Sequence, residues 1–452
     1  MIGRRIIAVA ALALLLAAPA ASRADEPWTL DRAIDYALVN NPDLAVYAAD
    51  VRTAEQVSKQ VFGNYLPQLA LEGGYQYLGN VPTITVKIKL PEDLPIDLDI
   101  PPMKMEMGSH DNYQAQFKLD QLLFGSGRVF YGHRAARSQV DGRQAQYRTA
   151  QLKVAQLTAE AFLGLLITGE NLDARQQALD AAQQHLDQVT NRHEAGAASR
   201  YELLRAQVEV NNLEPQVHEA QEMLDLAQSG FRRALGLPED ASVLVAGSLQ
   251  TDVAPLSEES ALQSALVNRP EFELIDAGVR AYEDLARSRR AQMLPALMFS
   301  GSYGYSKPYY FDKEGDLNWS VGLGLRVPIF DGLRSWHEAG ESRAQAHSLR
   351  MARTRLRADV DNELRSAELS RREAELRVRS TSRTVETAES MVQIAEQSYT
   401  AGALTSLDVI DAQLALTNAR LLHLKALYDY RLSQVRLAAA GGDLEMIRRL
   451  SQ

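Results

Sequence analysis

The residues best placed to do chemistry are Asp408 and Asp411, which follow Gly402 at the start of a helical pattern. Because they are three residues apart on a helix, both carboxylates can point to the same side. Carboxylates gathered at a constriction bind cations and repel anions, and their crowding raises some of their pKa values. Either aspartate can instead simply stabilise the positive N-terminus of its helix. The spacing therefore leaves two interpretations open: carboxylates that favour cations at a constriction, or residues that cap the helix.

The sequence lacks the motifs of the common enzyme classes. The eight histidines are scattered without metal-ligand spacing, and there is no cysteine. The Gly-Leu-Gly at 322–324 precedes no helix, and no Walker or Gly-x-Ser-x-Gly sequence occurs. Met103, Met105 and Met107 followed by His110 suggest a soft-metal site, but strand alternation explains that spacing better. We expect no catalytic residue, no metal and no cofactor.

The segment around Gly402 has a second copy around Gly196, and 402 minus 196 is 206. Each glycine joins two long heptad-patterned runs, which predicts the turns of two helical hairpins at 195–200 and 401–406. An Asn-x-Pro phrase also recurs, with prolines at 42 and 270, a difference of 228. Proline starts a helix well because its missing N–H needs no partner there. The constant offsets predict a duplicated chain.

Four segments alternate polar and apolar residues with a period of two, which predicts strands at about 67–78, 113–124, 295–306 and 318–329. About ten residues suffice for a tilted strand to cross a bilayer, although soluble sheets alternate too. Aromatic residues collect at both strand ends, as in interfacial girdles. The insert between the first two strands predicts an extracellular hairpin. The polar face carries full charges, which suits a watery barrel lumen: Glu72, Lys118, Asp120 and Arg326.

Composition and the N-terminus narrow the location of the protein. A net charge of −10 argues against nucleic acid as a partner. Residues 1–24 combine two arginines, a short apolar run and small residues before Asp25, which predicts a cleaved signal peptide. No later apolar run approaches the length of a membrane-spanning helix, so we expect any membrane crossing to be made by strands.

These features together resemble the TolC-like outer-membrane efflux protein family, over essentially the whole mature chain. The resemblance is carried by the two Asn-x-Pro openings, the Leu-Pro strand entries, residues 327–332 and the two glycine turns followed by acidic residues. It implies an α+β membrane protein with an internal two-fold repeat. Three protomers would each give four strands to a twelve-stranded transmembrane β-barrel, which a long periplasmic α-helical coiled-coil barrel continues.

The resemblance also implies a domain organisation and a location. Residues 25–236 would form the first repeat and 260–442 the second, with an equatorial bridge at 237–259 and a short tail at 443–452. The protein would lie in the outer membrane of a Gram-negative bacterium and extend into the periplasm.

For the entrance of the tunnel, the resemblance implies a gate on the second glycine turn, where Asp408 and Asp411 match the family's acidic residues. Glu202 takes the place of an aspartate on the first turn, and Tyr399 matches a tyrosine before the second. Leu404 stands where the best-known member has a latching arginine. Residues at both tips would contact a periplasmic adaptor: Gly196, Ala197, Ser199, Gly402, Ala403, Leu404 and Thr405.

The function implied by the resemblance is a passive channel-tunnel, not an enzyme. It would export small molecules or polypeptides together with a periplasmic adaptor (membrane fusion) protein and an inner-membrane pump of the RND, ABC or MFS type. The alternative is a periplasmic coiled-coil structural or adaptor protein whose strands form a soluble β-domain. Recovery with the outer membrane favours the first, and recovery in the osmotic-shock fraction favours the second.

Overall fold

The computed structural model describes residues 27–86, 101–106, 108–249, 265–308 and 314–450. The predicted signal peptide lies outside these residues. The chain forms two compact units. Unit 1 comprises Met1–Ala48, Gln146–Glu271 and Arg355–Gln452, and unit 2 comprises Ala49–Ala145 and Phe272–Thr354.

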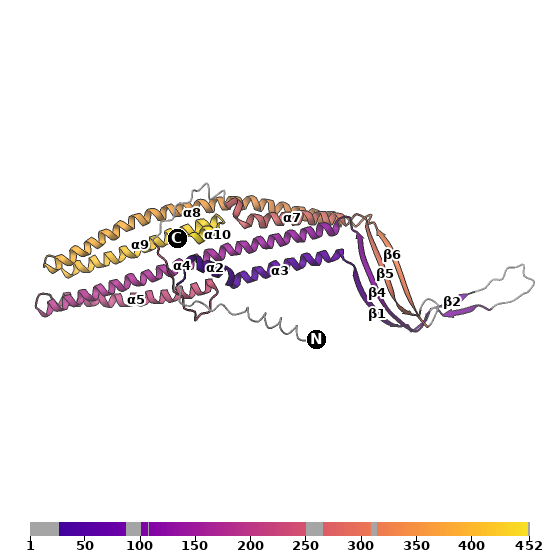
Figure 1. Ribbon diagram of the computed structural model, residues 1–452, viewed down its shortest axis with the longest axis horizontal. Helices are drawn as coiled ribbons and strands as arrows, with labels where there is room; N and C mark the ends of the chain where they lie inside the picture. Colours follow the sequence, from indigo (N-terminus) through magenta and orange to yellow (C-terminus); the bar gives the residue numbers. More distant parts are fainter. Residues whose placement is uncertain (1–26, 87–100, 107, 250–264, 309–313, 451–452) are drawn as a thin grey trace, which may run out of the picture. The chain divides into compact units, whose positions relative to one another are not determined.

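Unit 2 contains an antiparallel sheet of four strands in the order β1-β4-β5-β6 (Figure 1). The strands are β1 (Gln68–Tyr77), β4 (Asp111–Phe124), β5 (Ala296–Lys307) and β6 (Asp316–Arg326). The last strand ends three residues earlier than the sequence predicts, because Pro328 has no N–H to donate to a ladder. A separate two-stranded sheet pairs β2 (Thr83–Val86) with β3 (Met103–Glu106) in the insert. The insert's predicted alternation at 87–90 and 96–100 falls outside the described residues.

The strand register keeps the polar and apolar alternation in phase across all four strands. Lys118 lies opposite Ala70 on β1 and opposite Ser302 on β5, which in turn lies opposite Ser320 on β6. Because successive side chains alternate between faces, even-numbered residues share one face and odd-numbered residues share the other. One face is therefore polar, and the other is apolar and aromatic.

Four helical segments adjoin the sheet in unit 2, and each continues one strand. They are the end of α3 (Pro42–Phe62), which leads through η1 (Gly63–Tyr65) to β1, the start of α4 (Arg128–Glu194), α7 (Pro270–Ala291) and the start of α8 (Arg334–Thr400). Asp284 of α7 forms an ion pair with Arg134 of α4 at 3.2 Å, and Arg353 of α8 donates to Asp276 of α7 at 2.8 Å. The helices thus neighbour one another in the order of their strands.

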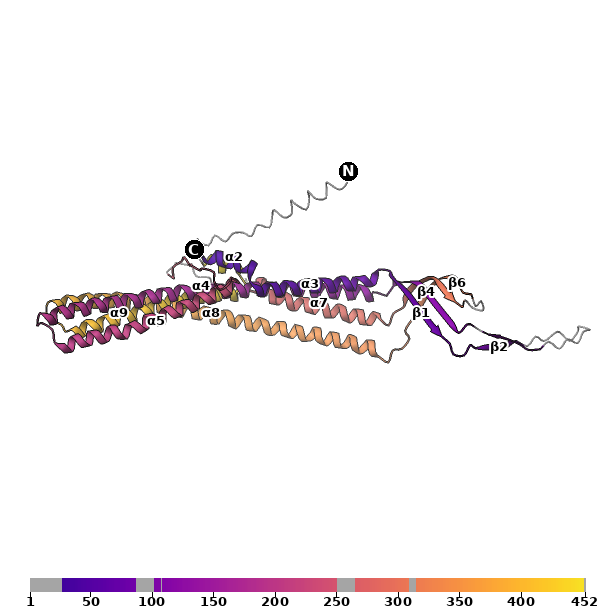
Figure 2. The ribbon, with the colours of Figure 1, turned by 90° about the horizontal axis from the view of Figure 1, so that it is seen from below.

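Unit 1 contains two helical hairpins, in which α4 pairs with α5 (Arg200–Leu235) and α8 pairs with α9 (Ser406–Ala440). Figures 1 and 2 both show the two helices of each hairpin side by side up to their connecting turn. The seam of the first hairpin buries small and branched side chains at heptad positions: Leu179, Ala182, Val210 and Leu213. This interleaving is what the sequence periodicity predicts.

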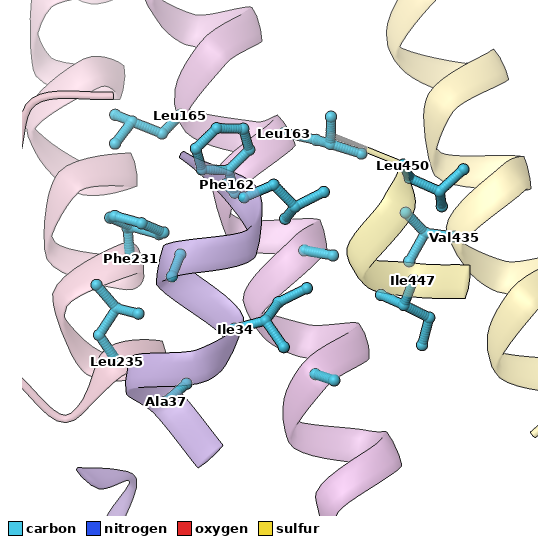
Figure 3. Close-up of a cluster of buried hydrophobic side chains, with 14 of the residues drawn as sticks. Ile34, Ala37, Phe162, Leu163, Leu165, Phe231, Leu235, Val435, Ile447 and Leu450 are labelled. Atoms are coloured by element: carbon cyan, nitrogen blue, oxygen red, sulfur yellow. The ribbon is translucent and has the colours of Figure 1, made fainter. Parts of the chain in front are cut away.

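The main core of unit 1 joins both hairpins to two short helices, α2 (Leu30–Asn40) and α10 (Leu444–Arg449). Phe231 and Leu235 of α5 lie beside α2, while Ile447 of α10 lies near Val435 of α9 (Figure 3). The described part of the predicted bridge also contributes, through Val243 and Leu249. The remainder of that bridge falls outside the described residues.

The two proline-started helices begin against equivalent glycines. At Gly236 an added Cβ would lie 2.8 Å from the carbonyl oxygen of Asn40, and at Gly442 it would lie 3.1 Å from the backbone nitrogen of Arg269. Both glycines have positive φ, 77° and 70°. Their numbers differ by 206, the same offset as the hairpin glycines. In each half, a helix thus ends at a glycine that lets the next proline-started helix approach its backbone closely.

The sequence predicts no membrane-spanning helix, and one helix of the structure bears on that expectation. Among the described residues, α4 contains one window that is long and apolar enough to be a candidate by composition. Its side chains at Val154, Phe162 and Leu163 are buried in the core of unit 1. Packing inside the protein therefore accounts for part of the apolar window, of which 39% is buried.

Candidate functional site

The two hairpin turns have the same backbone construction. Gly196 and Gly402 adopt φ of 74° and 78°, the left-handed conformation that favours glycine. The next N–H then donates to the carbonyl oxygen five residues back, from Ala197 to Arg192 at 2.7 Å and from Ala403 to Ser398 at 2.8 Å. This pattern ends a helix while satisfying its last carbonyl groups. Both turns therefore reverse the chain in the same way.

Glu202 and Asp408, the predicted acidic residues of the two turns, each form hydrogen bonds at the start of the returning helix. On the first turn, Glu202 accepts from the backbone N–H of Ser199 at 3.1 Å. On the second, the carboxylate of Asp408 accepts from the backbone N–H of Thr405 at 2.8 Å and from its hydroxyl at 2.7 Å. These are capping interactions. Within one protomer, hydrogen bonds from Thr405 lower the pKa of Asp408.

Asp411 lies one turn further along α9 and is exposed, as is Asp408. The residues between and after them, Val409, Ile410 and Ala412, are buried. The two carboxylates therefore share the solvent side of α9, as their spacing predicts. No hydrogen bond or ion pair involves Asp411 within the described part of the chain, so its position serves no evident structural purpose in one protomer.

Tyr399 occupies the contact between the two hairpins, next to the second turn. Its side chain is only 4% exposed and packs with Val189, Ala206 and Val409. The guanidinium of Arg192 lies 4.5 Å from the centroid of the Tyr399 ring, and its Nη1 donates to the Tyr399 carbonyl oxygen at 2.9 Å. Burial raises the pKa of Tyr399. The first hairpin thus holds this tyrosine through one cation.

His185 lies on the other side of the same aromatic ring. Its ring centroid is 5.3 Å from that of Tyr399, and its Nε2 lies 2.8 Å from the hydroxyl oxygen of Ser406. Burial lowers the pKa of His185, and hydrogen bonding to the backbone of Ser406 opposes that shift. Arg192, His185 and Ser406 therefore complete a tie between the hairpins that is centred on Tyr399.

The predicted contact residues of both tips lie at the protein surface. Gly196, Ala197, Ser199, Gly402, Ala403, Leu404 and Thr405 are all exposed. Leu404 has no charged group with which to latch onto the first hairpin. Beside the first tip, Tyr201, Leu204 and Val208 form an exposed stripe on one side of α5.

Three of the four predicted lumen residues come together on the polar face of the sheet. The amine of Lys118 lies 3.9 Å from Glu72 and 3.5 Å from Asp120. Arg326 lies apart from them, opposite Ala296 at the end of β6. These charges remain exposed, so they make a hydrated surface.

The opposite face of the sheet exposes a continuous apolar surface. Leu69, Leu71, Trp319, Val321 and Leu323 are each about two-thirds exposed. A soluble monomer rarely leaves a patch of this kind in water. The sheet is therefore amphipathic in the sense that a membrane strand requires.

The methionines of the insert lie in the paired strand β3. Met103 is opposite Val86 and Met105 is opposite Ile84, and His110 instead stacks on Tyr77 at a centroid separation of 5.7 Å. Met107 falls outside the described residues. Within the described ranges, no group of three or more His, Asp or Glu side chains could hold a metal ion.

Comparison with known proteins decides the family. The sequence profile described as "Outer membrane efflux protein" matches residues 33–237 and 261–443, most of the chain. The chain belongs to this family. It is an outer-membrane channel for export that extends into the periplasm, and the family is one of channel proteins.

Individual relatives agree with this assignment. The alkaline protease secretion protein AprF of Pseudomonas aeruginosa is 26% identical over 362 residues, which cover 75% of this chain and 72% of AprF. The outer membrane protein TolC of Escherichia coli K12 is 25% identical over 438 residues, 90% of this chain and 81% of TolC. The crystal structure of CusC matches the fold with a TM-score of 0.73 at 18% identity, covering 92% of both chains.

Sequence reasoning missed Arg192, His185 and Ser406 in this efflux protein. A basic residue in the last turn of a helix usually reflects the helix dipole, which gives no reason to single out Arg192. His185 lies next to the heptad position Leu186. A polar residue beside the helix seam was therefore the one sequence feature that could have indicated a contact there. Ser406 shows no distinctive pattern.

Proposed function

We propose that three copies of this chain close one twelve-stranded transmembrane β-barrel, which a helical barrel continues into the periplasm. The support is the pair of sheet edges, β1 and β6, both exposed along their whole length. An unpaired backbone group costs several kcal/mol in hydrocarbon, so these edges need partners. Two copies would reach the minimum of eight strands, and the family resemblance selects three.

The mass of the crosslinked protein in detergent tests this closure. We expect a species of three chains that migrates as a trimer until it is heated. A crosslinked mass of one chain would reject the proposal, because four strands alone leave open edges.

We infer that the chain arose by internal duplication. The two hairpin turns have the same backbone construction, and helices start in the same way at Pro42 and Pro270. Gly196 and Gly402 are 206 residues apart, and so are Gly236 and Gly442. The extracellular insert then accounts for the larger offset of 228 in the first half, where it adds 22 residues.

We propose that the second turn forms the periplasmic entrance. Three-fold symmetry would repeat Asp408 and Asp411 as two stacked rings of carboxylates, with Glu202 on the neighbouring turn. Such rings favour cations, and in the closed ring crowding would raise some of the carboxylate pKa values. Asp411 carries most weight, since Asp408 also caps α9. The contact between Arg192 and Tyr399 would hold the two hairpins together. It would replace the latching arginine of the family, whose position is occupied here by Leu404.

We propose that the exposed tips meet a periplasmic adaptor protein, which links the channel to an inner-membrane pump of the RND, ABC or MFS type. The support is position: each tip ends a helix of 67 residues, roughly 100 Å long. Glutamate at Ala197 or Ala403 should abolish export while trimer migration stays normal. Unimpaired export by both variants would reject the contact.

The alternative, a soluble periplasmic adaptor, conflicts with the exposed apolar face of the sheet. Membrane fractionation separates the two functions. We expect the protein in the outer-membrane fraction, and recovery in the osmotic-shock fraction would favour the adaptor.

A further inference from the structure

A cationic groove lies between α7 and α8 in unit 2. It encloses about 360 Å³ and is lined by Glu283, Ala286, Arg287, Arg290, Arg343, Ala346 and Arg350. Four arginines and one glutamate give this lining a net charge of +3, whereas the whole chain carries −10. The positive charge of the groove is thus opposite in sign to the protein's overall charge.

The arginines of the groove differ in their partners. Arg350 pairs with Glu283, and Arg287 donates to the buried carboxylate of Asp284 at 2.8 Å. Within the described part of the chain, Arg290 has no carboxylate partner, and Arg343 has neither an ion pair nor a hydrogen bond. These two guanidinium groups therefore remain able to bind an anion from outside.

Trp336 lies beside the end of the groove that is nearest the sheet. Arg290 lies in the last turn of α7 and Trp336 in the first turn of α8, and the guanidinium lies 5.3 Å from the indole ring. The tryptophan is 58% exposed. Tryptophan is the residue most characteristic of the membrane interface, where an apolar ring meets polar headgroups. Arg290 thus lies where the strands that cross the membrane give way to helices.

The groove continues away from the membrane along the same side of α8. Trp336, Arg343 and Arg350 follow at steps of seven residues, so they share one helix face. At 1.5 Å per residue, Arg343 lies roughly 10 Å beyond Trp336. The headgroup layer on one side of a bilayer is about 5 to 8 Å thick, so the long side chain of Arg343 can reach back to it.

We propose that this groove binds the phosphate group of an anionic phospholipid in the periplasmic leaflet of the outer membrane. Arg290 and Arg343 would donate to phosphate oxygens, since the planar guanidinium fork matches phosphate geometry. Trp336 would lie against the glycerol and upper acyl region. The inference goes beyond export itself and is independent of the proposed gate, but it requires the outer-membrane location.

Lipid retention by the purified full-length protein tests the site. The protein is placed in phosphatidylethanolamine nanodiscs, phosphatidylglycerol is titrated in, and bound lipid is counted by native mass spectrometry. Each arginine near a membrane surface contributes about fivefold in affinity, so R290Q/R343Q should bind phosphatidylglycerol about thirtyfold more weakly. R355Q/R357Q removes the same charge from α8 outside the groove and should bind like the wild type.

A single variant and two further measurements keep the proposal falsifiable. R343Q changes an exposed side chain that has no ion pair or hydrogen bond within the described residues, so it should fold normally and lose about fivefold in affinity. Equal lipid binding by R290Q/R343Q and R355Q/R357Q would overturn the site. Displacement of the lipid by inorganic phosphate would show a free-anion site instead. Altered ion selectivity in planar bilayers with unchanged lipid binding would place the groove in the lumen.

Discussion

The two hairpin turns share one backbone but differ in what holds them. Each has a glycine at positive φ, the same reversed hydrogen bond and an acidic residue at the start of the next helix. Three residues before the glycine, the first turn has the half-buried His193 and the second has the buried Tyr399. Tyr399 thus anchors the second turn in the neighbouring hairpin, whereas His193 bonds to Ala198 within its own turn. The backbone therefore specifies the reversal at both turns, and a single side chain specifies how the second turn is held.

The largest difference in stability between the two turns should appear when Tyr399 and His193 are each replaced by alanine. Tyr399→Ala removes a buried aromatic ring and should cost about 3 kcal/mol locally. His193→Ala should cost far less, because that side chain is less buried and its hydrogen bond, to Ala198, stays within its own turn. Hydrogen exchange at residues 185–206 and 395–412 measures the loss. Equal exchange in the two variants would contradict the assigned role of Tyr399.

Replacement of Arg192 should have the next largest effect on the contact between the hairpins. Arg192→Ala removes both the stacking on Tyr399 and the hydrogen bond to its carbonyl oxygen, about 1 to 2 kcal/mol together. Because the chain has no cysteine, spin labels on A197C and A403C report the separation of the two tips directly. We expect a wider, broader distance distribution in Arg192→Ala and partial recovery in Arg192→Lys. An unchanged distribution would show that the apolar contacts alone hold the hairpins.

The glycines should behave alike, in contrast to Tyr399 and His193. At both Gly196 and Gly402 an added Cβ meets nothing within 4 Å, so only the left-handed backbone opposes alanine. Each Gly→Ala variant should lose about 1 kcal/mol. Thermal melts of the two variants should coincide, and a clear difference would mean that the turns are not equivalent.

The smallest expected effect is a dependence on pH through His185. Burial lowers the pKa of His185, so the folded hairpins bind its proton less readily than the unfolded chain does. Protonation of His185 therefore favours the unfolded chain. The folded hairpins keep their full stability above the ordinary histidine pKa of about 6.5 and lose part of it as pH falls. Arg192 and Glu202 are the charged groups nearest Tyr399, and the cation should oppose protonation further.

Matched histidine variants isolate that dependence. The spin-label distance should broaden between neutral and mildly acidic pH in the wild type and in His193→Gln. It should stay constant in His185→Gln. The same broadening in His185→Gln would assign the effect to another group.

Sequence patterns were sufficient for the elements and insufficient for the tie between them. Alternation and proline positions locate the strands, and glycine with heptads locates the turns, because these depend on local backbone geometry. The contact of Arg192 with Tyr399 joins residues 207 positions apart and follows from how the hairpins pack. The spacing of Asp408 and Asp411 predicted a shared helix side but could not separate a gate from a cap. The structure gives Asp408 a capping bond, and the gate stays a prediction.

Planar-bilayer recordings of D411A and of D408A/D411A decide whether the second turn is the entrance, with E214A, at an exposed glutamate further along α5, as the control. If it is the entrance, both variants should lose cation selectivity and be blocked less by multivalent cations, and E214A should behave like the wild type. The melting temperature should fall only where the capping Asp408 is removed. Unchanged conductance and ion preference in both variants would show that these carboxylates form no gate and that the constriction lies elsewhere.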